Sequence, residues 1–292
     1  MAELCKPQNT IAILQKYEFV FQKKYGQNFL IEPRVLEKII QAADITKEDM
    51  VLEIGPGIGS MTQYLCESAK KVIAVEIDRN LIPILKNDTL ADYDNVIIIQ
   101  EDILKMNIRE LAEKENDGRP IKIVANLPYY ITTPIIMAIF ENNVPVENVT
   151  VMVQKEVADR IQTGPGTKDY GALSLAVQYY AKPEIVANVP SNCFIPRPNV
   201  SSSVIRLARY KECPVFVENE RIMFKIIRAA FNQRRKTLQN SICNAQDLSF
   251  TKVQIAKVLQ KMNLSPTIRG ETLSLEQFAE FTNFLTERKE SF

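Results

Sequence analysis

The stretch that decides the fold is VLEIGPGIGSMTQYL, residues 51–65, in which an apolar run meets a glycine-rich turn and then a helical pattern. Glycines allow a tight bend at such a turn and let a ligand approach the backbone closely. A dinucleotide-binding turn requires G-x-G-x-x-G, but here Ser60 occupies the third dinucleotide position. The glycines that are present give G-x-G-x-G instead: Gly55, Gly57 and Gly59.

An acidic residue, Glu53, stands just before this turn. With the altered glycine spacing, it favours S-adenosylmethionine as the ligand over NAD, because S-adenosylmethionine has no pyrophosphate for the turn to hold. A glycine-rich loop alone is weak evidence, so the interpretation depends on what the neighbouring strands carry.

The sequence around the turn alternates between strand and helix patterns, which predicts βαβ units in a mostly parallel sheet. The strands are expected at Met50–Ile54, Lys71–Ile77, Asn95–Glu101, Ile121–Leu127 and Val149–Gln154, and the helices at Glu32–Ile45, Ser60–Ser68, Asn80–Asp88, Ile108–Lys114 and Pro134–Asn142. Two later strands with no helix between them, in residues 183–190 and 201–209, predict an antiparallel hairpin at one edge.

After Tyr210 only helical patterns follow, at about Asn219–Cys243, Thr251–Met262 and Ser274–Arg288. We therefore predict a Rossmann-like α/β methyltransferase fold, with a mostly parallel seven-stranded sheet, followed by a small all-helical domain. The predicted domains are residues 1–207, including an N-terminal helical extension, and residues 208–292, which we expect to contact RNA.

The composition excludes several kinds of chemistry. The 292 residues include no histidine, which removes histidine general bases and histidine-ligated metals. Five dispersed cysteines without a CxxC pair fit reduced thiols better than a disulfide framework or a zinc site. We therefore expect no metal. We also expect a cytoplasmic protein, because the sequence has neither a signal-peptide core nor an apolar run long enough to span a membrane.

Two further acidic residues follow the expected second and third strands. Glu76 is placed to accept both ribose hydroxyls of a cofactor, and Asp102 to accept from its adenine amino group. The isoleucines directly after them, Ile77 and Ile103, are also cofactor-binding candidates. Each acid alone could simply cap the next helix, but three strand ends carrying the loop and both acids in order favour S-adenosylmethionine, with S-adenosylhomocysteine as the product.

The segment VANLPYYITTP, residues 124–134, ends the fourth expected strand on an amide, a proline and two tyrosines. An exocyclic amine of a nucleobase is a poor nucleophile, because its lone pair is delocalised into the ring. Two acceptors on its N–H groups would favour the nucleophilic geometry, and the Asn126 side chain and the Leu127 carbonyl offer them. Pro128 holds Leu127 extended, and Tyr129 supplies a face for the flipped base, where stacking is worth about 1–3 kcal/mol.

A second wall of this base pocket is assigned to Phe194, an aromatic residue on a proline-stiffened loop. The alternative for Phe194 is a place in the hydrophobic core. Tyr130 has no role in this scheme, and we expect it to pack against the protein.

Net charge is only +1, but residues 221–240 hold six basic residues and no acidic one. Four recur at helical spacing, which would place them along one stripe that contacts the phosphate backbone of a nucleic acid. A solvated helix face is the competing interpretation. The candidate RNA-binding residues are Arg221, Lys225, Arg228, Arg234, Arg235 and Lys236.

At this point the chain resembles the KsgA-type family of ribosomal RNA adenine dimethyltransferases. The resemblance rests on KKYGQNFL, VLEIGPGIGSMT, VIAVEID, ANLPYYITTPI, MVQKEVADRI, PGTKDYGALS, FIPRPNVSSSVI, FNQRRKTLQN and IRGETLSLEQF, in order from residue 23 to residue 278.

The resemblance implies dimethylation of two adjacent adenosines in a hairpin loop near the 3′ end of small-subunit ribosomal RNA. The expected partner is the RNA within a pre-ribosomal small-subunit particle, and the expected state of the protein is a monomer. The resemblance also implies that Gln27, Asn28 and Leu30 help to close the cofactor pocket, and that Asn126 contacts the cofactor as well as the base.

Two rival functions remain at this stage. The related Erm type modifies large-subunit RNA, but NLPY rather than NIPY and the full C-terminal helical segment favour the small-subunit reaction. An assembly factor that has lost catalysis would belong to a different functional class, and the intact Asn126, Tyr129 and Glu76 argue against it.

Overall fold

The structure is a computed structural model that describes residues 3–287. Its internal contacts divide the chain into two compact units, Met1–Ala158 with Lys182–Arg209, and Asp159–Ala181 with Tyr210–Phe292. The predicted division after residue 207 differs from this grouping in residues 159–181, which belong with the helical unit.

The first unit is built on a seven-stranded sheet in the order β4-β3-β2-β5-β6-β9-β7. The strands from β4 to β6 pair in parallel, and β9 pairs antiparallel to β6. This agrees with the predicted mostly parallel sheet and antiparallel edge. The strands are β2 Met50–Ile54, β3 Lys71–Glu76, β4 Val96–Gln100, β5 Ile121–Asn126, β6 Val146–Gln154, β7 Ala181–Val189 and β9 Ser202–Arg209.

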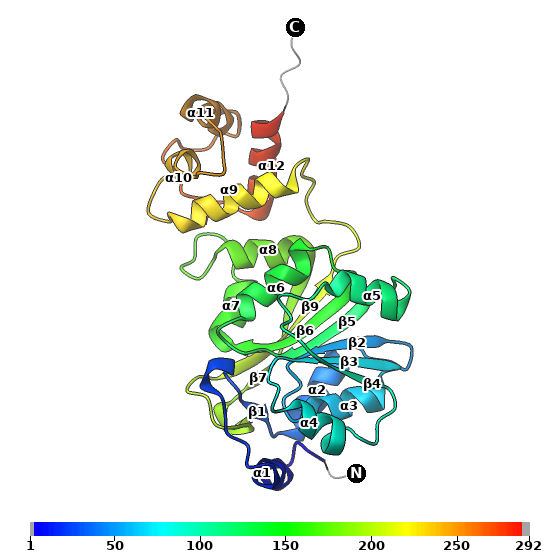
Figure 1. Ribbon diagram of the computed structural model, residues 1–292. Helices are drawn as coiled ribbons and strands as arrows, with labels where there is room; N and C mark the ends of the chain where they lie inside the picture. The colour runs from blue at the N-terminus through cyan, green and yellow to red at the C-terminus, as the bar shows by residue number, and fades with distance from the viewer. Residues whose placement is uncertain (1–2, 288–292) are drawn as a thin grey trace. The chain divides into compact units, whose positions relative to one another are not determined.

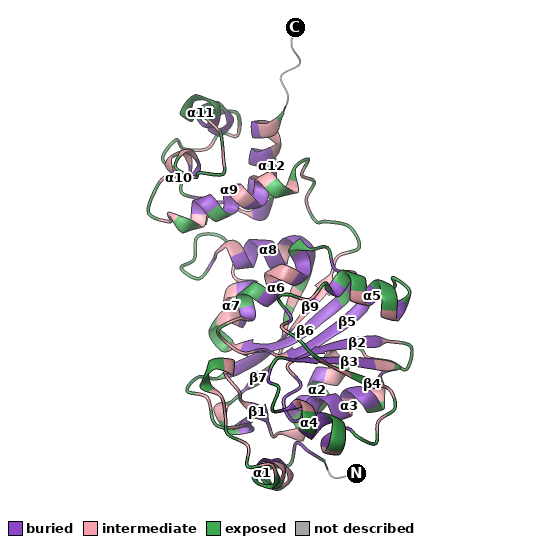
Figure 2. Cartoon of the chain, viewed as in Figure 1, coloured by how far each residue is buried: buried purple, intermediate pink, exposed green. Residues whose placement is uncertain are grey.

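Helices cover both faces of this sheet, with α2, α3 and α4 on one side and α5 and α6 on the other (Figure 1). All five residues of β2 are buried, as expected for a central parallel strand between two helical layers (Figure 2). The helices are α1 Pro7–Lys16, α2 Pro33–Ala42, α3 Ser60–Ser68, α4 Ile82–Ile84, α5 Ile108–Asn116, α6 Thr132–Glu141 and, across the boundary of the two units, α7 Lys155–Gln162.

A short antiparallel ribbon ties the N-terminal segment to the loop before β9. In it β1, Phe29–Leu30, pairs with β8, Phe194–Ile195. A 3₁₀ turn at Lys23–Tyr25 and the left-handed Gly26 precede this ribbon. The segment 25–30 is thereby brought to the carboxyl ends of the parallel strands.

The second unit is helical. It consists of α8 Ala172–Tyr180, α9 Glu220–Asn232, α10 Leu238–Cys243, α11 Lys252–Lys261 and α12 Leu275–Thr286. The Tyr180 ring stacks on Phe224 of α9, with 5.6 Å between ring centroids, and the Glu220 carboxylate accepts hydrogen bonds from the Tyr179 and Tyr180 hydroxyls. These contacts explain why α8 groups with α9 rather than with the sheet that precedes it in sequence.

One helix prediction in this unit needs correction. The helix expected at Asn219–Cys243 is two helices, because the chain leaves helical geometry after Asn232 and Thr237 caps the start of α10. The last helix begins near its predicted start, with a capping box formed by Ser274 and Gln277. Its expected end at Arg288 lies outside the described residues.

Candidate functional site

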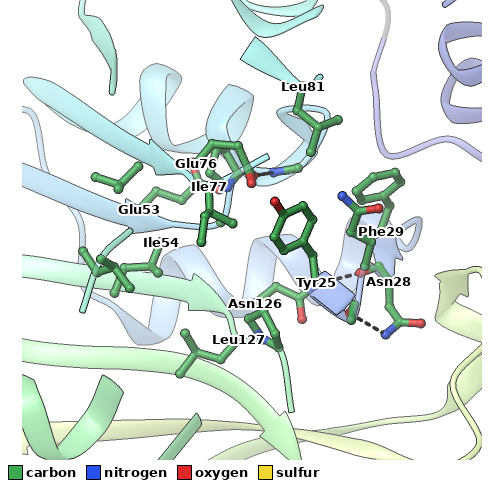
Figure 3. Close-up of a pocket in the computed structure, with 18 of the residues that line it drawn as sticks. Tyr25, Asn28, Phe29, Glu53, Ile54, Glu76, Ile77, Leu81, Asn126 and Leu127 are labelled. Carbon is green, nitrogen blue, oxygen red and sulfur yellow. Dashed lines mark hydrogen bonds between the residues drawn. The ribbon is translucent and has the colours of Figure 1, made fainter. Parts of the chain in front are cut away.

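A cavity opens at the carboxyl ends of the parallel strands, where open α/β sheets bind ligands. Its walls come from the turn after β2, from the ends of β3 and β5, from the loop after β4 and from the N-terminal segment 25–30 (Figure 3). Every residue of the predicted cofactor set lines it: Gln27, Asn28, Leu30, Gly55, Gly57, Glu76, Ile77, Asp102, Ile103 and Asn126.

The glycine-rich turn needs its glycines for two different reasons. Gly55 has a φ of 71°, and a Cβ added there would meet no atom within 4 Å. Gly57 has a φ of 63°, and a Cβ there would lie 2.9 Å from the Phe29 ring. The turn therefore leaves open space beside Gly55 and packs tightly against Phe29 at Gly57.

Glu76 ends β3 as a nearly buried carboxylate that is held from two sides. It accepts hydrogen bonds from the backbone N–H of Gly57, at 3.2 Å, and of Asp78, at 2.8 Å. Burial raises the pKa of Glu76 to about 7, against the lowering effect of these N–H groups. The carboxylate faces the cavity between the turn and the strand end, as its predicted ribose role requires.

Glu53 lines the cavity with a buried carboxyl group that lacks a hydrogen-bond partner among the described residues. Its side chain is fully buried, and neither carboxylate oxygen has a hydrogen-bond partner among the described residues. Burial raises the pKa of Glu53 to about 8; the nearby Thr62 hydroxyl opposes this shift and the Glu76 charge adds to it. The sequence placed Glu53 before the turn, but it did not indicate a buried carboxyl without a partner.

Asp102 lies where its predicted role of accepting from the cofactor adenine requires, and that role stays a prediction. It lines the cavity, and its side chain also accepts from the backbone N–H of Leu104 at 3.1 Å. The neighbouring Ile103 is almost buried, whereas the Ile77 side chain is 42% exposed within the cavity wall. An exposed aliphatic side chain beside a strand-end acid provides an apolar surface for a ligand ring.

Asn126 is oriented by one hydrogen bond. Its amide nitrogen donates to the backbone carbonyl of Asn28 at 2.8 Å (Figure 3). Because the nitrogen is committed to that carbonyl, the side-chain oxygen of Asn126 is the end left to accept from a ligand. The carbonyl of Leu127 likewise receives no hydrogen bond from any described residue, while its N–H donates to Met152.

Tyr129 lines the cavity and is fixed by a residue that the sequence analysis missed. Its hydroxyl shares a hydrogen bond of 2.8 Å with the hydroxyl of Ser202, a fully buried residue of β9. Burial raises the pKa of Tyr129, against the lowering effect of Ser202. The run of three serines at residues 201–203 was the only signal, and nothing in it singles out the middle one.

One glutamine and one asparagine of the N-terminal segment use their side chains for hydrogen bonds within the protein. The Gln27 amide donates to Asp78 at 2.7 Å and accepts from the backbone of Gln22. The Asn28 side chain donates to the Gly26 carbonyl. Both residues therefore shape the wall of the cavity by fixing the segment that also orients Asn126.

The prediction for Phe194 is not met in this structure. Its ring is 1% exposed, packs in a core cluster with Leu30 and Val204, and is absent from the described residues that line the cavity. Pairing of β8 with β1 turns the ring into the core, so the alternative considered for it describes its position. Phe194 does not form the second wall here.

The expectation for Tyr130 is also wrong. Its side chain is 55% exposed and lines the cavity instead of packing against the protein. Tyr25 from the N-terminal segment lines the same cavity, and its ring points inward toward the side that carries Glu76 (Figure 3). The sequence analysis assigned a role to neither tyrosine.

The six basic candidates of the helical unit fall into two groups. Arg234 pairs with Glu271 at 3.0 Å and donates to the Lys168 carbonyl at 2.7 Å, and Lys225 binds the Asp247 carbonyl. Arg234 and Lys225 are thus engaged within the unit, and their role as phosphate contacts stays a prediction. The exposed members are Arg221, Arg228, Arg235 and Lys236, of which only the first two lie on α9.

Residues 3–287 contain no group of three or more potential metal-ligating side chains of the histidine, cysteine or carboxylate type. The helices within the same range are all too short or too polar to cross a membrane.

Known proteins resemble this chain in sequence and in fold. The family model for ribosomal RNA adenine dimethylase matches residues 18–280. The chain is 63% identical over 288 residues to the ribosomal RNA small subunit methyltransferase A of Lachnoclostridium phytofermentans, with 99% of each protein covered. A dimethyladenosine transferase from Plasmodium falciparum has a TM-score of 0.72 and 28% identity, covering 87% of this chain and 95% of that one. The 23S rRNA methyltransferase ErmE shares the fold, with a TM-score of 0.66, 24% identity, and 89% and 100% of the two chains covered. The chain therefore belongs to the ribosomal RNA adenine dimethylase family.

Proposed function

We propose that this protein dimethylates the N6 amines of two adjacent adenosines in the 3′-terminal hairpin loop of small-subunit ribosomal RNA, with S-adenosylmethionine as the methyl donor. Family membership supports the reaction, and the name of the relative that is 63% identical supports the choice of subunit. The observation that carries the proposal is the orientation of Asn126, whose nitrogen is held by the Asn28 carbonyl.

The residues of the cavity fit this cofactor. The space beside Gly55 admits a ligand against the backbone, and the Glu76 carboxylate at the end of β3 suits a pair of ribose hydroxyls. The buried Glu53, which has no described hydrogen-bond partner, suits a ligand that carries positive charge. When bound, S-adenosylmethionine supplies an electrophilic methyl group on a positively charged sulfur.

The protein activates the amine by accepting its hydrogens. The free oxygen of Asn126 and the carbonyl of Leu127 each take one N–H of the adenine amine, which favours a pyramidal nitrogen with an available lone pair. Tyr129, held by Ser202, supplies the face on which the flipped base stacks. S-adenosylmethionine, when held by the residues of the cavity, would supply the methyl group, and the amine nitrogen held by Asn126 and Leu127 would release its proton to solvent.

We further infer that the substrate is a pre-ribosomal small-subunit particle in the cytoplasm and that the protein acts as a monomer. The helical residues 208–292 would hold the RNA through exposed basic side chains, with Arg221, Arg228, Arg235 and Lys236 as the candidates.

The experiment compares the wild-type protein with Asn126→Ala on small-subunit particles from cells that lack the methylation, using labelled S-adenosylmethionine. We expect a fall in kcat of about 100- to 1000-fold, the size typical for removing one oriented hydrogen-bonding group from an active site. Particle binding should stay within about twofold, since the side chain contributes little area to the whole RNA interface.

Asn142→Ala is the matched control, because it makes the same truncation at an exposed asparagine that does not line the cavity. Turnover by Asn126→Ala within tenfold of wild type would overturn the acceptor mechanism. Label found only in large-subunit RNA, offered in a parallel reaction, would overturn the assignment of the substrate.

A further inference from the structure

Tyr130 presents an exposed aromatic surface at the cavity that the proposed reaction does not use. Large apolar side chains that are exposed are few in the described residues, and only Ile77 and Tyr130 among them line the cavity. Ile77 follows the ribose-binding acid and is accounted for by the cofactor. The Tyr130 side chain, 55% exposed, is left without a ligand.

The backbone holds this ring in a fixed place. The turn between β5 and α6 is closed by the Ile131 N–H and the Thr132 hydroxyl, which both donate to the Pro128 carbonyl, at 3.2 Å and 3.1 Å. Gly26 backs the ring, since a Cβ at that glycine would lie 3.6 Å from the ring carbons. A ring already fixed in position loses little entropy when a ligand stacks on it.

The charges around Tyr130 select a neutral ligand. Burial raises its pKa, and the nearby Tyr25, Asp102 and Glu76 raise it further, so the hydroxyl stays a neutral phenol. The Asp102 carboxylate lines the same cavity and repels the phosphate groups of RNA. The flat face of a nucleobase is the part of an RNA chain that fits this position.

We propose that Tyr130 is a specificity-determining residue, on which the nucleotide next to the target adenosine stacks while that adenosine occupies the catalytic pocket. The inference rests on the proposed function. A base that flips out of its stack leaves its neighbour without a partner, and an aromatic ring replaces that contact. Tyr129 and Tyr130 are consecutive, with Cα atoms about 3.8 Å apart, so one short loop offers a ring to each of two adjacent nucleotides.

The test measures KM for unmethylated small-subunit particles, together with the Kd of S-adenosylmethionine, for wild type, Tyr130→Ala and Tyr130→Phe. Because a base–aromatic stack is worth about 1–3 kcal/mol, Tyr130→Ala should raise the particle KM about 5- to 150-fold. Tyr130→Phe should stay within about twofold, since it keeps the ring. The control is Phe216→Ala, which removes an aromatic ring that is 78% exposed and lies outside the cavity.

The possible outcomes distinguish a failure of the stacking role of Tyr130 from a failure of the proposed methylation reaction. A particle KM for Tyr130→Ala within twofold of wild type, or an equal rise for Phe216→Ala, would overturn the stacking role. A weakened Kd for S-adenosylmethionine with an unchanged particle KM would place Tyr130 in the cofactor site and also overturn it. If wild type itself labels no small-subunit RNA, the proposed function fails first, and the stacking role fails with it.

Discussion

At the scale of single residues, the carbonyl of Asn28 decides which end of the Asn126 amide meets the substrate. A backbone group from the N-terminal segment, 98 residues away in sequence, thus sets the polarity of the catalytic side chain. Any shift of the segment 25–30 would release the amide to rotate. The N-terminal segment therefore contributes to catalysis through Asn126 as well as to closure of the cavity.

The buried carboxyls predict that cofactor binding releases protons. Burial sets the pKa of Glu76 at about 7, so near pH 6.5 roughly three-quarters of these groups carry a proton before binding. Ribose hydroxyls that donate to the ionised carboxylate would lower this pKa and expel the proton. Calorimetry of S-adenosylmethionine binding at pH 6.5, in buffers of different ionisation enthalpy, should therefore show heats that depend on the buffer.

In the absence of cofactor, the raised pKa values of the two buried glutamates make the protein less stable as the pH rises. Both Glu76 and Glu53 have folded-state pKa values above 4.5, so their stabilising contribution is complete below pH 4.5 and is lost as pH rises through about 7 to 8.

Glu76→Gln should abolish most of the buffer dependence of the binding heat. Identical heats for wild type in all buffers would contradict the predicted proton release.

The residues that could be predicted are those fixed by local sequence. Glu76 and Asn126 end strands, and the end of a parallel strand points to the cavity whatever the rest of the chain does. Phe194 and Tyr130 could not be placed in this way. Their exposure depends on the pairing of β8 with β1 and on the position of Gly26, and both are contacts between distant parts of the sequence.

At the scale of elements, the break between α9 and α10 divides the basic segment by role. Arg234 lies in the break, where it forms an ion pair with Glu271 and donates a hydrogen bond to the Lys168 carbonyl. Arg235 and Lys236, which follow it, are exposed. Helical periodicity predicted one continuous stripe, because the four basic residues at helical spacing carry no signal for a turn. The turn, rather than a helix face, presents these two cations.

This division predicts different effects for neighbouring substitutions. The double variant Arg235→Ala/Lys236→Ala should reduce the slope of log K for particle binding against log salt by about 1.4 to 1.8, since each lost phosphate contact removes about 0.7 to 0.9. Arg234→Ala should instead cost about 1–3 kcal/mol of unfolding free energy through its lost hydrogen bonds to charged and backbone groups. Filter binding at several salt concentrations and thermal unfolding would measure the two effects.

The double variant also serves as the stability control for Arg234→Ala, because its two side chains have no described partner of comparable strength. An unchanged salt slope for Arg235→Ala/Lys236→Ala would return these residues to the status of a solvated surface.

At the scale of the whole molecule, the helical unit is discontinuous in sequence. The parallel sheet and its edge follow from periodicity alone, so they were predictable, but the position of α8 was not. Its apolar sequence, ALSLAVQYY, suits any buried helix, and only the partners Glu220 and Phe224, more than 40 residues later, identify its unit.

Hydrogen exchange would test this grouping in the intact protein. Phe224→Ala removes a nearly buried ring that packs on Tyr179 and Tyr180, a change that typically costs about 3–5 kcal/mol. Amides of α8 should lose protection together with those of α9, while amides of β2 and β5 keep theirs. Phe216→Ala, which truncates an exposed ring, should change neither set.

If α8 kept its protection in Phe224→Ala while α9 lost its own, the helix would belong with the sheet, and the grouping described here would be wrong.

The order of the two units along the chain has a consequence during protein synthesis. The sheet lacks only β7 and β9 when α8 emerges, but the helices that cover α8 are translated last. At roughly 5–20 residues per second, α8 waits on the order of ten seconds for α12. Over that interval α8, whose buried residues include Leu175 and Val177, lacks its contact with α12. The nascent chain thus exposes an apolar helix that chaperones can bind, and the rate of translation sets how long this helix stays exposed.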